Sequence, residues 1–229
     1  MGLKFKHEPI DLGYNDLEAV TGDKGRFYTD PEGNKYASVT TVLSILSEHA
    51  IQAWRARVGE EEANRVSRIA STRGTTVHNI IEKYIANDPE YIKDEMPHNI
   101  QTFKDIQPVL DECVTKVYQQ EAPLFSKHLG LAGRVDLVGQ WKGVDSIIDW
   151  KTSRKLKKKE WIDSYFMQCS AYAIMWEERT RMPITQLVTL ITVDNEQPQV
   201  FIEHRDNWVR PLKETIAQWN EENSTLQFV

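Results

Sequence analysis

Hydrophobic positions recur at helical spacing in four long stretches of the chain. Between residues 60 and 87 the apolar side chains lie three or four residues apart, which predicts one long amphipathic helix. The same spacing predicts helices over residues 98–120, 158–178 and 206–222. The first of these helices is expected to end at Asn87-Asp88-Pro89, because proline cannot continue a helix.

Elsewhere the apolar runs are short and are separated by glycine. Three such runs follow one another at residues 122–128, 131–141 and 144–151, and two more occupy residues 185–194 and 198–203. Their β-branched and aromatic content predicts strands, and a tight turn near Lys142-Gly143 joins the second strand to the third. Helices and strands in this order predict an α/β fold, in which a central mixed β-sheet is flanked by helices.

The first 59 residues have a different character from the rest of the chain. Residues 1–35 are polar and rich in glycine and aspartate, which predicts a loose arm with a short hairpin. The apolar run at 36–46 predicts a short helix capped by Ser38 or Thr40. We therefore expect one domain, residues 1–229, in which an N-terminal arm and short helices form a helical N-terminal portion before the core of residues 60–229.

Composition excludes several classes of protein. Hydrophobic residues make up 40% of the chain, which is too many for a disordered protein. No run approaches the roughly 18 apolar residues of a transmembrane helix, and the N-terminus lacks the apolar centre of a signal peptide. The only cysteines, Cys113 and Cys169, suggest neither a disulfide framework nor a four-cysteine metal site. A cytoplasmic location without membrane contact is expected.

The net charge of −6 argues against a protein that coats nucleic acid along its whole surface. The positive charges are nevertheless clustered. Residues 154–159 read RKLKKK, and arginines are also frequent between residues 55 and 73. Local positive regions on an acidic chain suit an enzyme that holds a polyanion at one place. The candidate phosphate contacts are Arg73, Arg154, Lys155, Lys157, Lys158 and Lys159, although a solvated loop would explain the lysine run equally well.

The sequence Asp149-Trp150-Lys151 places a carboxylate and an ammonium group on the same side of a predicted strand. Such a pair can hold a metal ion and a water molecule side by side, although an ordinary surface ion pair has the same sequence. Asp136 lies on the preceding strand and can approach Asp149 if the two strands form a hairpin. Because neighbouring carboxylates repel, a cation would stabilise them, and oxygen ligands favour Mg²⁺ or Mn²⁺ over zinc. Pairing of Asp136 with Arg134 is the alternative.

Three further features could complete such a site. Glu121, expected at the end of the second helix, could supply another carboxylate ligand. His78 lies at the edge of the apolar stripe of the long helix and could reach a metal held by the sheet, although a lone histidine is more often structural. Gln168 and Tyr172 are four residues apart, so they share one face of a helix.

Taken together, the order and spacing of these residues resemble the PD-(D/E)XK nuclease superfamily, RecB-like branch. That branch is marked by a helical histidine, a G-x-x-D strand, a D-x-K strand and a Q-x-x-x-Y helix, here at His78, Gly133-x-x-Asp136, Asp149-x-Lys151 and Gln168-x-x-x-Tyr172. The YASVTTVL and RGTTVH segments further resemble the mitochondrial genome maintenance exonuclease group and its phage and bacterial relatives. Two features depart from the pattern: no proline precedes Asp136, and the cysteines of the iron–sulfur nucleases are absent.

The resemblance implies a restriction-endonuclease-like core and a role for each residue. Asp136 and Asp149 would bind Mg²⁺ or Mn²⁺ together with the Trp150 carbonyl and His78, and Glu121 is an additional candidate ligand. Lys151 would orient the attacking water and stabilise developing charge. Gln168 and Tyr172 would position the scissile strand. Neither an iron–sulfur cluster nor a nucleotide cofactor is expected, since the four-thiolate set and the Walker A sequence are both missing.

These roles imply a metal-dependent deoxyribonuclease whose partner is DNA. An exonuclease that acts on single-stranded ends in replication, recombination or DNA turnover is the leading hypothesis, because the chain is small and has no recognisable DNA-reading domain or motor. A phage-encoded protein would then work inside the bacterial host cell. A structure-selective or restriction-type endonuclease is one alternative. An inactive nuclease fold that only binds DNA or a protein partner is the other.

Overall fold

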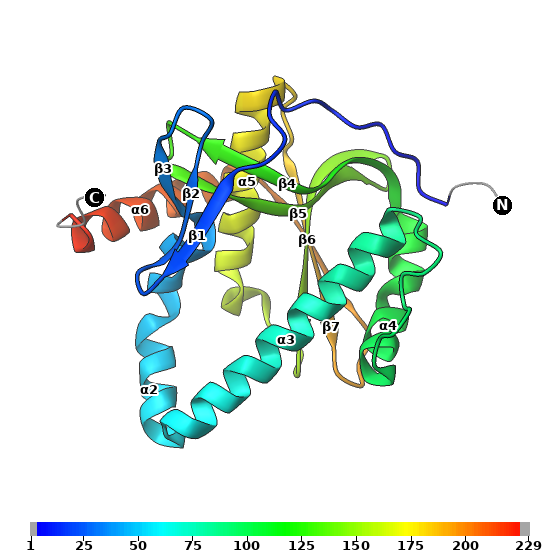
Figure 1. The fold of residues 1–229 in the computed structure, drawn as a ribbon, viewed down its shortest axis with the longest axis horizontal. Coiled ribbons are helices and arrows are strands. Elements are labelled where there is room, and N and C mark those ends of the chain that lie inside the picture. The colour runs from blue at the N-terminus through cyan, green and yellow to red at the C-terminus, as the bar shows by residue number, and fades with distance from the viewer. Residues whose placement is uncertain (1–3, 225–229) are drawn as a thin grey trace.

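The computed structural model of the chain describes residues 4–224 and contains one mixed β-sheet with helices on both faces (Figure 1). In spatial order the sheet runs β1-β2-β3-β5-β6-β7-β8, and β4 pairs with β5 off this path. The β3–β5 and β6–β7 pairs are parallel, and the other pairs are antiparallel. The strands are β1 (Glu18–Gly22), β2 (Gly25–Thr29), β3 (Lys35–Ser38), β4 (Val114–Ser126), β5 (Leu131–Trp141), β6 (Val144–Ser153), β7 (Gln186–Val193) and β8 (Gln199–His204).

The helices cover the sheet from two sides, and each side has its own buried apolar cluster. Helices α3 and α4 bury one face with Leu137, Ile148 and Trp150, whereas α1, α5 and α6 bury the other with Val135 and Ile147. The mixed sheet flanked by helices confirms the expected fold class. The helical elements are α1 (Val39–Leu43), the 3₁₀ turn η1 (Ser44–Ser47), α2 (Glu48–Val58), α3 (Glu60–Ile85), α4 (Pro97–Cys113), the 3₁₀ turn η2 (Lys159–Trp161), α5 (Asp163–Thr180) and α6 (Asp206–Glu222).

Several local predictions are confirmed by the structure. The side chain of Ser38 accepts a hydrogen bond from the Thr41 amide and so caps α1. The β5–β6 hairpin turns at Lys142 and Gly143, which both have positive φ angles, of 51° and 82°. This is the backbone conformation that a two-residue hairpin loop requires. The arm contains the expected hairpin, as β1 and β2, and β3 joins it to the main sheet.

The predicted helix over 98–120 is wrong beyond Cys113. Residues 114–120 begin β4, and two register shifts occur there, between Val114 and Lys116 and between Val117 and Gln119. Because these irregularities turn both Val114 and Val117 into the same apolar cluster, their three-residue spacing imitates a helix. The start of the predicted 158–178 helix is also wrong, since α5 begins only at Asp163 after the η2 turn.

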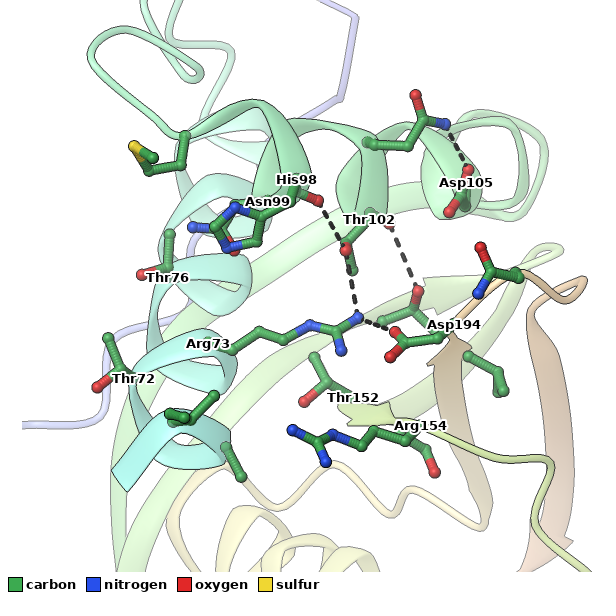
Figure 2. A pocket seen from close by; sticks show the side chains of 18 of the residues that line it. Thr72, Arg73, Thr76, His98, Asn99, Thr102, Asp105, Thr152, Arg154 and Asp194 are labelled. Atoms are coloured by element: carbon green, nitrogen blue, oxygen red, sulfur yellow. Dashed lines mark hydrogen bonds and ion pairs between the residues drawn. The ribbon is translucent and has the colours of Figure 1, made fainter. Parts of the chain in front are cut away.

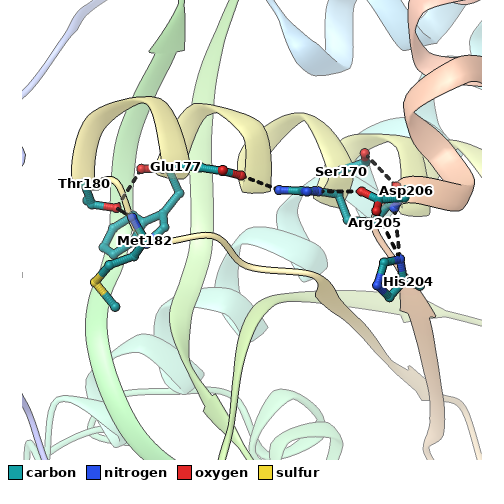
Figure 3. Close-up of polar contacts among 8 residues, drawn as sticks. Ser170, Glu177, Thr180, Met182, His204, Arg205 and Asp206 are labelled. Atoms are coloured by element: carbon teal, nitrogen blue, oxygen red, sulfur yellow. Dashed lines mark hydrogen bonds and ion pairs between the residues drawn. The ribbon is translucent and has the colours of Figure 1, made fainter.

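Hydrogen bonds and ion pairs connect α5 to α6 at the β8 end of the sheet (Figure 3). The Arg205 guanidinium donates to Glu177 of α5 and to Asp206 of α6, over 2.5 Å and 3.0 Å. The Ser170 hydroxyl donates to the Arg205 carbonyl over 3.3 Å. These bonds hold α5, which carries Gln168 and Tyr172, in a fixed position. Among the described residues, no helix is both long and apolar enough to cross a membrane.

Candidate active site

The candidate site lies where β5 and β6 separate. Backbone pairing of these strands runs from Trp141–Val144 to Leu137–Ile148, and Leu137–Ile148 is the last pair at the far end from the turn. Beyond it the Asp136 carboxylate takes the place of a backbone acceptor, because its Oδ2 accepts the Trp150 amide N–H over 2.9 Å. The strands therefore form a fork, which leaves room between them for polar side chains.

Three potential metal ligands meet at this fork. One ligand atom each from His78 of α3, Glu121 of β4 and Asp136 of β5 lies within 4.8 Å of the others. His78 Nδ1 lies 3.5 Å from Asp136 Oδ1. Glu121 belongs to a strand and not, as expected, to the end of a helix. Its φ angle of 48° is unusual for a residue other than glycine.

The two carboxylates of this cluster repel each other, and His78 partly compensates the charge of Asp136. Burial and the neighbouring Asp136 and Glu82 charges raise the pKa of Glu121 to about 7. Burial alone would raise the pKa of Asp136, but the hydrogen bond and charge of His78 override it and hold that pKa below its usual value. In turn, burial would lower the pKa of His78, and Asp136 reverses that effect and raises it. A cation between the carboxylates would remove this repulsion, so the donor set fits a divalent metal ion.

Asp149, which is buried, and Lys151, which is half-buried, form an ion pair beside the cluster. Lys151 Nζ lies 2.7 Å from Asp149 Oδ1, and Gln168 Nε2 donates to the same oxygen over 3.1 Å. Burial, opposed by Lys151 and reinforced by Asp136, raises the pKa of Asp149 to about 6. Burial would lower the pKa of Lys151, but the Asp149 and Asp136 charges hold it above its ordinary value. Lys151 is therefore a cation at neutral pH, and it is not free to accept a proton.

A pocket of about 430 Å³ opens onto this fork. It is lined by His78, Glu121 and Asp136 and, from α5, by Gln168 and Tyr172. Sequence reasoning missed the part of the wall that β2 and the α1 N-terminus supply, which comprises Arg26, Tyr28, Ser38 and Thr40. Sequence motifs give no signal for Arg26 and Tyr28, because only the β2–β3–β5 pairing brings them to the fork, whereas Ser38 and Thr40 lie in the YASVTTVL segment.

The glycine of the G-x-x-D strand has a packing role. A Cβ atom at Gly133 would lie 2.8 Å from the Tyr172 hydroxyl and from its ring. Only glycine therefore allows Tyr172 to lie against β5. Arg134, next in sequence, is paired with Asp16 of the arm and also donates to the Glu121 carbonyl over 2.7 Å. The alternative pairing of Arg134 with Asp136 is thus replaced by a contact that fixes the backbone of Glu121.

A second and larger cleft lies on the other side of α3, between α3, α4 and the ends of β6 and β7 (Figure 2). Its volume is about 970 Å³. Arg73 lies in this cleft, where it is ion-paired with Asp194 and donates to the Thr102 hydroxyl over 3.3 Å. Arg154 also lines the cleft. The structure therefore places both arginines away from the His78–Asp136 pocket.

The lysine run occupies the segment between β6 and η2. The backbone of Lys157 exchanges two hydrogen bonds with the Gln199 side chain of β8, over 2.7 Å and 2.9 Å. Lys159 pairs with Glu203, and Lys158 Nζ lies over the Trp161 ring. The Ser153 hydroxyl donates to the Lys155 carbonyl over 2.6 Å. The segment is thus anchored to the sheet, while its charged ends remain largely exposed.

Residues 49–227 match the family model of the PD-(D/E)XK nuclease superfamily, and the chain belongs to that superfamily. Among solved structures it is similar to a candidate exonuclease from Eubacterium rectale, with 12% identity, a TM-score of 0.47 and coverage of 68% of this chain and 69% of that one. It is also similar to the protein SSO0001, with 12% identity, a TM-score of 0.32 and coverage of 67% and 84%. No curated protein shows significant sequence similarity to the chain.

Proposed function

We propose that the protein is a metal-dependent deoxyribonuclease that hydrolyses phosphodiester bonds at the ends of single-stranded DNA, with Mg²⁺ or Mn²⁺ as its cofactor. The observation that carries the proposal is the meeting of the His78–Glu121–Asp136 cluster with the Asp149–Lys151 pair at one fork in the sheet. Membership of a nuclease superfamily supports hydrolysis of nucleic acid.

The ligands proposed for the ion are His78, Asp136 and Asp149, with Glu121 as an additional carboxylate and the Trp150 carbonyl as a backbone donor. When bound, a divalent ion supplies a nucleophile at neutral pH and neutralises charge on the phosphate. The Trp150 amide already donates to Asp136, so the backbone at this position is fixed relative to the cluster. Asp149 must turn one oxygen from Lys151 to the ion if it acts as a ligand.

Lys151 acts as an electrostatic group in this proposal. Because the Asp149 and Asp136 charges raise its pKa, the Lys151 ammonium is protonated and can donate hydrogen bonds to the attacking water or to the phosphate. Its fixed charge in a largely buried site stabilises the additional negative charge of the transition state. Gln168, held against Asp149 at 3.1 Å, would keep the carboxylate oriented while strand contacts form near Tyr172.

Single-stranded DNA is the proposed substrate because the YASVTTVL and RGTTVH segments resemble exonucleases. The pocket of about 430 Å³, walled by α3, α5 and the β2–α1 region, has the volume of a site for one drug-sized molecule, which suits one nucleotide unit. Action at ends rests on the sequence resemblance to exonucleases, and a test must separate it from internal cleavage.

The decisive experiment compares three DNA substrates: end-labelled linear single strand, linear duplex and closed circular single strand, each with Mg²⁺ and with chelator. The expected result is rapid degradation of the linear single strand with Mg²⁺, while the circle stays intact. Cutting of the circle would establish an endonuclease instead. DNA binding without cleavage of any substrate, with Mg²⁺ or Mn²⁺, would establish a binding module.

A further inference from the structure

Trp161 is a large aromatic side chain that the fold leaves in solvent. It is 63% exposed, whereas the other six tryptophans of the chain are buried or half-buried. The η2 turn fixes its backbone, because the Trp161 amide donates to the Lys158 carbonyl over 3.0 Å. The next residue, Ile162, is buried against Phe166 and Ile191 and anchors this turn to the sheet. The exposure of Trp161 is therefore imposed by a rigid local structure.

The surroundings of Trp161 are basic. Lys158 Nζ lies 5.2 Å from the centroid of its ring, a cation–π contact that covers one face. Lys155 and Arg154 are exposed on the same connection between β6 and η2. Among the acidic neighbours, Glu203 pairs with Lys159 and Glu160 lies 4.0 Å from Lys158, while Asp163 at the start of α5 is exposed. An exposed aromatic ring among positive charges complements a base together with its phosphates.

Trp161 also lies close to the proposed chemistry. Tyr165, one helical turn further along the chain, has its ring centroid 5.3 Å from Lys151 Nζ. The η2 turn that carries Trp161 ends directly before α5, so one short stretch of chain, residues 161–165, joins the exposed ring to the neighbourhood of Lys151. A strand whose phosphate occupies the fork can extend along this stretch to Trp161.

We propose that Trp161 is a stacking platform for a base of the single-stranded DNA whose backbone enters the β5–β6 fork. This inference rests on the proposed function and adds a positioning residue to it. Stacking on an aromatic ring tolerates any base, since every base has a π-face, and it is a general means of holding single strands. Stacked bases are unpaired, so the contact also favours single strand over duplex.

The test uses chelator-treated full-length protein, so that binding is measured without cleavage. The ligands are an oligothymidylate and an abasic strand of equal length and charge. Trp161→Ala should weaken oligothymidylate binding by about tenfold or more, whereas Trp161→Phe should stay within roughly threefold of wild type. Neither variant should change the affinity for the abasic strand. Val20→Ala, at an exposed site on β1, is the matched control and should bind as wild type does.

Intrinsic fluorescence gives a second measurement, because Trp161 is the exposed tryptophan of the described chain. Quenching by oligothymidylate should be present in wild type and largely lost in Trp161→Ala. Unchanged oligothymidylate affinity in Trp161→Ala would overturn the inference and leave the nuclease proposal intact. An equal loss for the abasic strand would do the same, since the effect would then not be stacking. Wild-type protein that binds neither strand would overturn this inference, while the cleavage assay with Mg²⁺ decides the nuclease proposal separately.

Discussion

The fork pocket and the α3–α4 cleft lie on opposite sides of the same helix, and they differ in how their charges are balanced. The cleft has about twice the volume of the pocket. Its central cation, Arg73, is neutralised within the protein by Asp194 (Figure 2). In the pocket, by contrast, Glu121 and Asp136 face each other, and burial and their repulsion raise the pKa of Glu121 to about 7. The smaller cavity is the one with unbalanced charge.

Cavity size alone therefore does not select the candidate site. A paired group such as Arg73 contributes to stability and has little need of a ligand, whereas crowded carboxylates persist at a cost that a bound cation relieves. The difference in charge balance between the pocket and the cleft can be tested by removing one charged group at a time. The variants below are ordered from the largest expected effect to the smallest.

The largest effect is expected from Asp136→Asn. Because the substitution removes a carboxylate from the cluster, cleavage should fall by about 10³-fold or more, as several kcal/mol of charge stabilisation are lost. Affinity for Mn²⁺, measured calorimetrically, should also fall, while DNA binding should survive because repulsion of phosphate decreases. Asp105→Asn, in the α3–α4 cleft, is the control and should keep wild-type values. Equal Mn²⁺ affinity in Asp136→Asn would remove Asp136 from the ligand set.

Lys151→Ala should have the next largest effect. The loss of a fixed positive charge near the phosphate should lower kcat by roughly 10²-fold, with Mn²⁺ affinity little changed. Single-turnover cleavage at saturating DNA measures the chemical step directly. Lys104→Ala, an exposed lysine on α4, controls for a general loss of charge. A wild-type kcat in Lys151→Ala would make its pairing with Asp149 purely structural.

Glu121→Gln should change stability in opposite directions with and without metal. The pKa of Glu121 is about 7 in the folded protein and lies near the ordinary glutamate value of 4.5 when unfolded. Its favourable contribution is therefore complete below about pH 4.5 and is lost as the pH rises through 7. Metal-free Glu121→Gln should melt a few degrees above wild type at pH 8, and this difference should shrink at pH 5.

Added Mg²⁺ should reverse the order of the two melting temperatures at pH 8. Wild type should then melt above Glu121→Gln, because it binds the ion more tightly and is stabilised more by it. Thermal melts at both pH values, with Mg²⁺ and with chelator, measure this reversal. Glu18→Gln, an exposed glutamate on β1, should show neither effect. An identical Mg²⁺ shift in wild type and Glu121→Gln would show that Glu121 does not bind the ion.

The smallest effect is expected in the cleft, from Asp194→Asn. It leaves the partly buried Arg73 without its charged partner, which should cost about 1 kcal/mol and lower Tm by roughly 2–4 °C. The cleavage rate of the folded protein should not change. A rise in DNA affinity without a change in Tm would show instead that Arg73 contacts phosphate once freed, as the sequence suggested.

The local patterns of the sequence determined much of the fold. The long helix α3, the β5–β6 hairpin with its turn at Lys142-Gly143, and α6 were all predicted, because each depends on residues close together in the chain. The boundary between α4 and β4 was not predicted. Register shifts around Val114 and Val117 give the apolar residues of this strand the three-residue spacing of a helix. Only the long-range pairing with β5 reveals that these residues are extended.

Candidate residues of the site were also found by sequence, but their arrangement was decided by the tertiary structure. The types and spacing of His78, Asp136 and Asp149 pointed to a metal-dependent nuclease. Nothing local indicated that Glu121 would face Asp136 from a neighbouring strand, or that Arg73 would lie on the far side of α3. Helix and strand periods say which face a side chain occupies on its own element. Which charges then meet depends on how strands pair and fork, and that is fixed by contacts between residues far apart in the chain.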